Sequence, residues 1–271
     1  MPGRRQLKKS TRRASPSPFG RLALLAVAAA CAVGAVLYLR LPSEAAMAET
    51  LRAPVRETAV MRARAAEALD KGRRFQPRQK WVELEHVSPE LVSAVLASED
   101  ARFFAHDGLD LLQIHAALRT DLAAGRSPRG ASTLTQQVVK NLYLSEERSL
   151  LRKAEEALLA HRLEGALTKK RILTLYLNIA EWGDGVFGVE AAAEHHLGKR
   201  AQQVGLAEAA ALAAMLPSPR RLAPDQRPAE LHRRALRVLR RMHEEGMISR
   251  AQEAAAKVEL ERWLGKPAAL N

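Results

Sequence analysis

Residues 88–110, which read SPELVSAVLASEDARFFAHDGLD, hold the signal that decides the fold. Ser88 is a typical helix-capping residue, Pro89 suits the first helical position, and Glu90 places an acid in the first turn, so a helix is predicted to begin here. Apolar side chains then recur at helical spacing and mark a stripe that faces the core. The members of this stripe are Val92, Val95, Leu96 and Phe103.

Glu99 lies inside this stripe, three residues after Leu96 and four before Phe103. A carboxylate that faces the core loses water, so its pKa is expected to rise toward neutrality, which suits a proton acceptor. The alternative is structural: a buried Glu99 paired with a nearby arginine. The segment by itself leaves both interpretations open.

Composition favours a helical protein with one sizeable core. The chain has 271 residues, of which 47% are hydrophobic, 27% charged and only 4% aromatic. Long stretches rich in Ala, Leu, Arg and Glu favour helix, and no convincing run of alternating β-branched residues indicates a strand. The single cysteine, Cys31, can form no internal disulfide. We therefore predict an all-α domain.

Local capping signals divide the chain into successive helices. Capping boxes predict helices that run from Asp110 to Gly125 and from Thr133 to Leu142. Further helices are expected to begin at Ser145 or Ser149, at Thr168, at Pro228 (a basic helix that ends near Gly246) and at Ser249, with turns at Asp107-Gly108 and Gly183-Asp184-Gly185.

The net charge of +13 suits nucleic acid, anionic lipid or a phosphorylated substrate. No helix-turn-helix, zinc-finger or RNA-binding aromatic motif is found, so nucleic acid is not an expected partner. From Leu22 to Leu39 eighteen consecutive residues carry no charge, a length that can just span a hydrocarbon core. Seven positive charges and no acid precede this run, at Arg4, Arg5, Lys8, Lys9, Arg12, Arg13 and Arg21.

This charge pattern predicts a cytoplasmic amino terminus, with the remainder of the chain outside. The competing interpretation is a cleaved signal peptide, because Ala46-Met47-Ala48 resembles a small-residue cleavage site. The apolar run is longer than most signal-peptide cores, which favours an uncleaved anchor. The expected organisation is a basic cytoplasmic tail (1–20), a transmembrane helix (21–41), a stalk (42–77) and a globular domain (78–265).

Polar groups that a structural helix would not need follow in four segments. The first is the carboxylate pair Glu99-Asp100. The second is the loop before Thr133, because a glycine loop entering a helix leaves backbone N–H groups free for an anion. The third is a cation–acid cluster around Glu156, usually explained as a solvated ion pair. The fourth surrounds Tyr176 and Asn178, where structural bracing is the simpler interpretation.

In order and spacing these segments resemble the peptidoglycan glycosyltransferases of glycosyltransferase family 51. The family signature Glu-Asp-x-x-Phe-x-x-His-x-Gly begins here at Glu99, and Gly-Gly-Ser-Thr-x-x-Gln-Gln begins at Gly130. Arg-Lys-x-x-Glu begins at Arg152, and Lys-x-x-Ile-Leu-x-x-Tyr-Leu-Asn begins at Lys169. A fifth family stretch resembles Glu208 to Pro217, so that the resemblance covers about residues 80 to 225.

The chain resembles in particular the monofunctional branch, the biosynthetic peptidoglycan transglycosylases. No serine has a lysine three residues later, and few residues follow the fifth stretch, so no transpeptidase domain is expected. The resemblance implies a lysozyme-like, largely helical fold. Ala131 stands where the family usually has a second glycine, and a methyl group is tolerable there unless the backbone needs a positive φ.

The resemblance implies that the protein polymerises lipid II into β-1,4-linked glycan and releases undecaprenyl pyrophosphate, at the periplasmic face of a bacterial inner membrane. It makes Glu99 the general base and Glu156 a second catalytic carboxylate that orients cations and the leaving phosphate. The implied substrate-binding residues are Lys140, Arg148, Arg152, Lys153, Ser132, Thr135, Gln136 and Asn178. No organic cofactor is implied. A divalent metal, Mg²⁺ or Mn²⁺, often assists the family; Asp100 beside Glu99 is the candidate ligand, and the sequence itself specifies no metal site.

Two other functions compete with this one. A lytic glycosidase also uses carboxylates beside a sugar bond, but it needs no cations for a departing pyrophosphate. A non-catalytic membrane-anchored scaffold could instead recruit other cell-wall synthesis proteins, but it would not need both Glu99 and Glu156.

Overall fold

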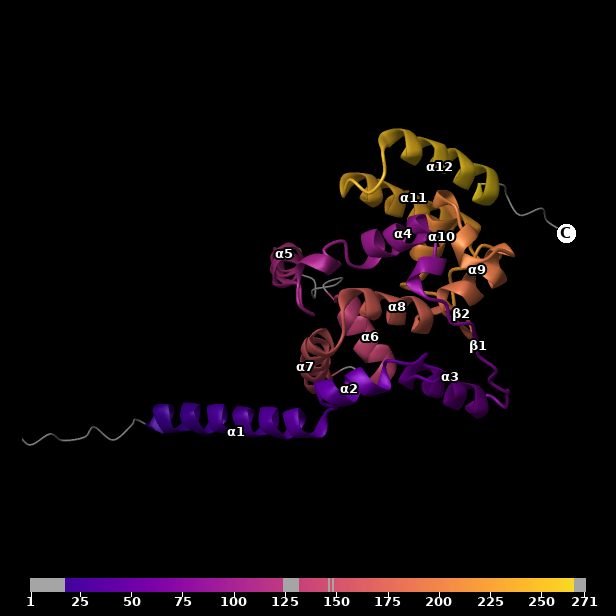
Figure 1. The fold of residues 1–271 in the computed structure, drawn as a ribbon. Coiled ribbons are helices and arrows are strands. Elements are labelled where there is room, and N and C mark those ends of the chain that lie inside the picture. The colour runs from indigo at the N-terminus through magenta and orange to yellow at the C-terminus, as the bar shows by residue number, and fades with distance from the viewer. Residues whose placement is uncertain (1–17, 124–131, 146, 148, 266–271) are drawn as a thin grey trace, which may run out of the picture. The chain divides into compact units, whose positions relative to one another are not determined.

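The computed structural model describes residues 18–123, 132–145, 147 and 149–265 of the chain (Figure 1). It divides the chain into two compact units, Met1–Leu41 and Pro42–Asn271. In the first unit, α1 (Pro18–Arg40) is the one described helix that is long and apolar enough to cross a membrane, judged by length and composition. Its described apolar side chains, such as Leu22, Leu24 and Leu25, are exposed.

The second unit is predominantly helical, as predicted. Short 3-10 turns at Leu84–His86, Phe103–Ala105 and Ala201–Gln203 separate some of its helices. The α-helices are α2 (Glu44–Thr50), α3 (Ala59–Asp70), α4 (Pro89–Glu99), α5 (Leu111–Ala123), α6 (Leu134–Tyr143), α7 (Leu150–Ala166), α8 (Lys169–Ile179), α9 (Val189–Leu197), α10 (Leu206–Met215), α11 (Pro228–Glu244) and α12 (Arg250–Leu264).

Helix α10 is central to one part of the core. Its sequence is rich in alanine and apolar on every side, and eight of its ten residues are buried, as expected of a helix surrounded by others. It packs against α4, α11 and α12 (Figure 1). A second packed group contains α6, α7 and α8, in which α6 contacts both of the others. The carboxyl end of α4 and the segment after it connect the two groups.

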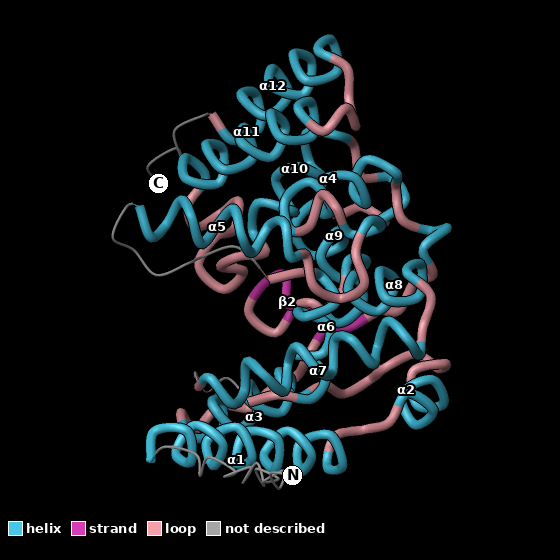
Figure 2. The backbone as a smooth tube through the Cα atoms, turned by 90° about the vertical axis from the view of Figure 1, so that its left-hand side faces the viewer, coloured by secondary structure: helices cyan, strands magenta, loops and turns pink. Residues whose placement is uncertain are grey.

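A small sheet that the sequence did not predict lies among the helices (Figure 2). It consists of β1 (Arg78–Gln79), β2 (Glu181–Gly183) and β3 (Val186–Phe187) in the order β1-β3-β2. β3 pairs in parallel with β1 and antiparallel with β2. Strands of two or three residues are too short to show an alternating pattern, so the sequence carried no strand signal. The predicted turn at Gly183-Asp184-Gly185 joins β2 to β3.

Most predicted helix starts are confirmed by side-chain caps. At each of these starts a side-chain hydroxyl oxygen accepts a hydrogen bond from the backbone N–H of the residue three positions later. The capping residues are Ser88, Thr133, Ser149, Thr168 and Ser249. Asp110 caps α5 in the same way, through the backbone N–H of Gln113. Of the two alternatives before α7, Ser149 is therefore the cap. The expected stop at Gly125 lies outside the described residues.

The apolar stripe of α4 differs from the prediction at its end. The helix ends at Glu99, so Phe103, although fully buried, belongs to the following 3-10 turn. The fully buried helical positions are Leu91, Ala94, Val95 and Ala97, whereas Val92 and Leu96 are only partly buried.

Residues 42–77 also differ from the expected stalk, because they pack within the second unit. Met47 and Leu51 are almost fully buried, and α2 lies against α7. The guanidinium group of Arg162 donates to the carbonyl oxygen of Pro42 at 2.8 Å. Arg171 donates to three successive carbonyl oxygens, at Leu51, Arg52 and Ala53. The packed domain therefore begins at about residue 42.

Candidate active site

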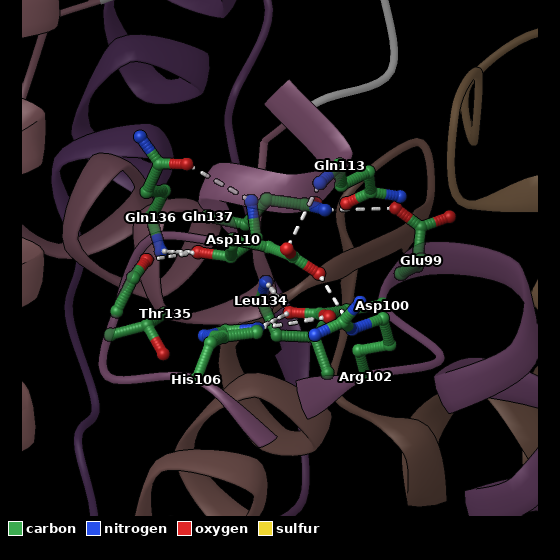
Figure 3. A network of polar contacts seen from close by, with 12 residues as sticks. Glu99, Asp100, Arg102, His106, Asp110, Gln113, Leu134, Thr135, Gln136 and Gln137 are labelled. Carbon is green, nitrogen blue, oxygen red and sulfur yellow. Dashed lines mark hydrogen bonds and ion pairs between the residues drawn. The ribbon is translucent and has the colours of Figure 1, made fainter. Parts of the chain in front are cut away.

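Glu99 is the last residue of α4, and its carboxylate receives two hydrogen bonds, of which Figure 3 shows the one from Gln137. Gln137 Nε2 of α6 donates to Oε2 at 2.9 Å, and Ser98 Oγ donates to Oε1 at 3.2 Å. Among the described residues no lysine or arginine forms an ion pair with Glu99. The structural alternative, a buried Glu–Arg pair, is therefore absent from this part of the chain.

The surroundings of Glu99 raise the pKa of its carboxyl group above the ordinary value near 4.5. Loss of water on burial is the largest cause, because it disfavours the charged form. The hydrogen bonds from Gln137 and Ser98 and the positive charge of Arg241 act in the opposite direction. Glu99 is thus a carboxylate with increased proton affinity that still has donors to hold its charged form.

The amide of Gln137 is oriented from its other side by a tyrosine. The hydroxyl group of Tyr176, on α8, donates to Gln137 Oε1 at 3.4 Å, so the amide nitrogen faces Glu99. Residue-by-residue reasoning did not assign a role to Gln137. Its position in the second motif, directly after Gln136, was the signal that would have found it.

Asp100 joins the end of α4 to the beginning of α6. Its carboxylate accepts from the backbone N–H of Leu134 at 2.9 Å and contacts His106 Nε2 at 3.0 and 3.1 Å (Figure 3). An acid at a helix amino terminus is stabilised by the free N–H groups there. Asp100 therefore positions α6, and with it Gln137, relative to Glu99.

The divalent metal that the family resemblance implies does not fit at Asp100 as this side chain is placed. Asp100 is almost completely buried, and both carboxylate oxygens already have partners. Among the described residues no group of three or more His, Cys, Asp or Glu is arranged to hold a metal ion. The metal requirement stays a prediction that polymerisation with and without a chelator would test.

The turn after Asp100 is held close to α6 and α7. Thr133 Oγ1 donates to the carbonyl oxygen of Gly108 at 2.6 Å. Gly108 has a φ of 86°, and a Cβ atom there would lie 3.1 Å from the backbone of Ala160 in α7. Glycine is required at this position both by its conformation and by the close approach of the helix.

Glu156 forms the second charged cluster, on α7. It is 3% exposed, and its carboxylate is paired with Arg152 Nη1 at 2.8 Å and with Lys153 Nζ. Lys153 also donates to Ser132 Oγ at 2.9 Å. This pairing compensates the buried charge of Glu156 and holds two cations on α7, of which Lys153 contacts the segment that enters α6.

The two carboxylates are connected through the beginning of α6. Glu99 contacts Gln137, in the first turns of the helix, and Glu156 is linked through Lys153 to Ser132, just before it. The helices α6 and α7 pack against each other. The predicted acids thus border the same short segment, residues 132–137, from two sides.

The remaining predicted substrate-binding residues differ in their placement. Lys140 is exposed and makes no hydrogen bond or ion pair with another described residue, and it lies one turn after Gln137 on α6. Arg148 and the Gly130-Ala131 pair lie outside the described residues.

Thr135, Gln136 and Asn178 are buried and serve the fold. Thr135 donates to Glu164 at 2.5 Å, and Gln136 completes the capping box with Thr133. The side-chain amide of Asn178 bonds to backbone groups of Val82 and Thr174. The hydrogen bonds of these three residues join parts of the fold, so the structure gives each a positioning role, and their contact with substrate stays a prediction.

Comparisons with known proteins place the chain in a family. The transglycosylase family model matches residues 43–243. A biosynthetic peptidoglycan transglycosylase of Rhodospirillum centenum is 48% identical over 164 residues, which are 60% of this chain and 71% of that protein. One from Herminiimonas arsenicoxydans is 42% identical over 185 residues, or 68% of this chain and 80% of the relative.

Among solved structures, the crystal structure of penicillin-binding protein 1A from Haemophilus influenzae matches with a TM-score of 0.41 and 22% identity. The match covers 68% of this chain and 18% of that one. Because the family model spans residues 43–243, which include α4, α6 and α7 with their acids and cations, this chain belongs to the transglycosylase family.

Proposed function

We propose that this protein is a peptidoglycan glycosyltransferase that polymerises lipid II at a membrane surface, with Glu99 as the general base. The observation that carries the proposal is the environment of Glu99. A carboxyl group with a raised pKa lies at a helix end, held by Gln137, beside the segment that the Glu156 cluster also borders.

The acceptor supplies a sugar hydroxyl group, which is a weak nucleophile at neutral pH. In the proposed reaction the 4-hydroxyl of the acceptor's N-acetylglucosamine attacks the anomeric carbon of the donor's N-acetylmuramic acid. Glu99 takes the hydroxyl proton as the β-1,4 bond forms and the bond to pyrophosphate breaks. A base with increased proton affinity suits this transfer, because its pKa lies nearer the working pH.

The leaving pyrophosphate requires positive charge where its negative charge develops. Glu156 holds Arg152 and Lys153 on α7, and Lys153 contacts Ser132 at the entry to α6. Lys140 is exposed on α6. In the proposal these cations bind the departing pyrophosphate, together with Arg148. Glu156 keeps Arg152 and Lys153 in place, so its contribution is to orient the cations.

Membrane attachment suits a substrate and a product that both end in lipid. We propose that α1 is an uncleaved anchor, with the amino terminus in the cytoplasm and the second unit at the periplasmic face of the inner membrane. The rival cleavage site Ala46-Met47-Ala48 lies within α2, where Met47 is fully buried. Cleavage there would break a helix of the packed domain.

The test is Glu99→Gln in the full-length protein, assayed with purified lipid II. The amide keeps the size of the side chain but cannot accept a proton at neutral pH. We expect turnover to fall by about a hundredfold or more, because general-base catalysis contributes factors of this size. Binding of lipid II should be retained. Unchanged turnover would remove Glu99 from the mechanism.

The stability of this variant is its control. Burial raises the pKa of Glu99, so the folded protein carries a cost for the charged form that is absent at pH below the unfolded value and complete above the raised value. Glu99→Gln removes that cost. Its melting temperature should match wild type at pH 4 and be equal or higher at pH 8, so that lost activity cannot be ascribed to unfolding.

The lytic alternative is tested in parallel by incubating wild-type protein with finished glycan. Fragments from glycan, without polymer from lipid II, would replace the proposed synthetic activity by a glycosidase activity.

A further inference from the structure

A cavity with an excess of positive charge lies beside the end of α4. It has a volume of about 320 Å³ and is lined by Ser98 of α4, by Ala214 and Pro217 at the end of α10, and by four residues of α11. Those four are Arg234, Arg237, Val238 and Arg241, which share one face of the helix. Helix α11 packs on both α4 and α10 (Figure 1).

The lining has three guanidinium groups and no carboxylate. Arg234 is paired with Glu230, outside the lining, at 2.7 Å. Neither Arg237 nor Arg241 forms an ion pair with another described residue. Unpaired guanidinium groups that converge on a cavity are suited to phosphate or carboxylate oxygens, which they bind through charge-assisted hydrogen bonds.

Other cavities of the second unit differ in this respect. The cavity next to Arg64 and Arg220 is also lined by Glu67 and Asp184, and both of these acids pair with Arg220. The cavity on the other side of Arg241 is lined by Asp110 and Glu245. Among these described cavities, only the one at Arg237 has cations without acids in its lining.

The cavity is adjacent to the proposed base. Arg241 Nη1 donates to the carbonyl oxygen of Ser98 at 3.3 Å, one residue before Glu99. From Arg241 back to Arg234 the backbone of α11 covers about 10 Å, at a rise of 1.5 Å per residue. A molecule whose hydroxyl group reaches Glu99 can therefore extend along this row of arginines.

We propose, on the basis of the function proposed above, that this cavity binds an oxyanion of the acceptor lipid II, with Arg237 and Arg241 as its ligands. The oxyanion is either a phosphate of the pyrophosphate or a carboxylate of the stem peptide. The site holds the acceptor while Glu99 removes its proton, and it is distinct from the cations around Glu156, which face the departing pyrophosphate of the donor.

The test compares Arg237→Glu with Arg233→Glu in the full-length protein in detergent. Both positions are exposed on α11, and the two changes alter net charge equally, but Arg233 does not line the cavity. Arg237 makes no described side-chain contact, so its replacement should leave the fold intact. We expect Arg237→Glu to raise KM for lipid II by about tenfold to a hundredfold, the equivalent of one lost charge-assisted hydrogen bond, with kcat within about twofold of wild type.

Two soluble probes identify the source of the oxyanion. Calorimetric titration with inorganic pyrophosphate tests the phosphate, and titration with the free stem pentapeptide tests the carboxylate. We expect Arg237→Glu to weaken binding of one probe and Arg233→Glu to weaken neither. If Arg237→Glu weakens neither probe, or if the two variants raise KM equally, the proposed site is wrong.

A membrane contact is the other use of such a surface. If Arg237→Glu reduces binding to phosphatidylglycerol vesicles and leaves KM for lipid II unchanged, the arginines serve the bilayer and the proposal is overturned. If the wild-type protein makes no polymer at all, the proposed function fails, whereas the probe titrations still decide whether the cavity binds anions.

Discussion

Glu99 is held between opposing effects. Burial favours its neutral form, whereas the hydrogen bonds from Gln137 and Ser98 favour the carboxylate. A base needs both: enough proton affinity to accept a proton, and enough stabilisation of the charged form to be ready for one. Gln137 supplies the shorter of the two hydrogen bonds and is itself oriented by Tyr176.

Replacing Gln137 by leucine should therefore change the pH dependence of polymerisation. Without the amide donor the pKa of Glu99 rises further, because a contact that favours the charged form is lost. The acidic limb of the kcat profile, where the base becomes protonated, should move to higher pH. The measurement is polymerisation rate between about pH 5 and 9.

Ser98→Ala is the companion variant for this measurement. Its hydroxyl donates over a longer distance, 3.2 Å against 2.9 Å for Gln137, so its shift should have the same direction and be smaller. An acidic limb that does not move in Gln137→Leu would mean that another group limits the rate at low pH.

At the scale of elements, the amino terminus of α6 is the part that brings the site together. It carries a capping box, donates the backbone N–H of Leu134 to the carboxylate of Asp100, and is bonded to the carbonyl oxygen of Gly108 through Thr133. These contacts come from α4, from the turn after it and from α6 itself. Loss of one of these contacts should therefore lower the free energy of unfolding by more than loss of an ordinary helix cap does.

Thr133→Ala tests this difference. The change removes the cap to Gln136 and the bond to Gly108, both buried, and should lower the free energy of unfolding by about 1–3 kcal/mol. Thr168→Ala removes an exposed cap of α8 and should cost about 0.5–1 kcal/mol. Urea denaturation of both variants in the same detergent gives the comparison. Equal losses would mean that the bond to Gly108 contributes nothing.

Helix starts could be predicted from the sequence, because a capping residue and the N–H group it binds are only three positions apart. Ser88, Thr133, Ser149, Thr168 and Ser249 each accept a hydrogen bond from a backbone N–H three residues later. Four of these caps were predicted outright, and Ser149 was one of two alternatives with Ser145. Contacts between distant residues could not be found in this way. Gln137 is 38 residues from Glu99, and the pairing of β1 with β3 joins positions more than a hundred residues apart. Only the complete fold brings these groups together.

At the scale of the whole molecule, residues 42–77 also show that local sequence signals do not predict contacts between distant parts of the chain. Their polar composition and prolines predicted a stalk, yet they pack on the domain through arginines that lie about 120 residues later in the chain. Arg162 binds the carbonyl oxygen of Pro42, and Arg171 binds those of residues 51–53. The second unit thus begins at Pro42, directly after the unit that contains α1.

Arg171→Ala should release this segment. The guanidinium group donates to carbonyl oxygens on three successive residues and also approaches the ring of Trp81 at 5.2 Å, so its removal leaves these three carbonyl oxygens without that donor. We expect trypsin to cleave after Arg52 and Arg56 several times faster than in wild type, because proteases cut backbone that is locally released. Mass spectrometry of the fragments over time gives the rates.

Lys170→Ala is the matched control, since Lys170 is the preceding residue, is exposed and makes no described side-chain contact. A stalk that is free of the domain would be cleaved at the same rate in wild type, Arg171→Ala and Lys170→Ala. A packed segment held by Arg171 would be cleaved faster in Arg171→Ala alone. Faster cleavage in Arg171→Ala alone would also mean that α8 holds the chain at the carboxyl end of α2. Helix α8 is also the helix whose Tyr176 orients Gln137 toward Glu99.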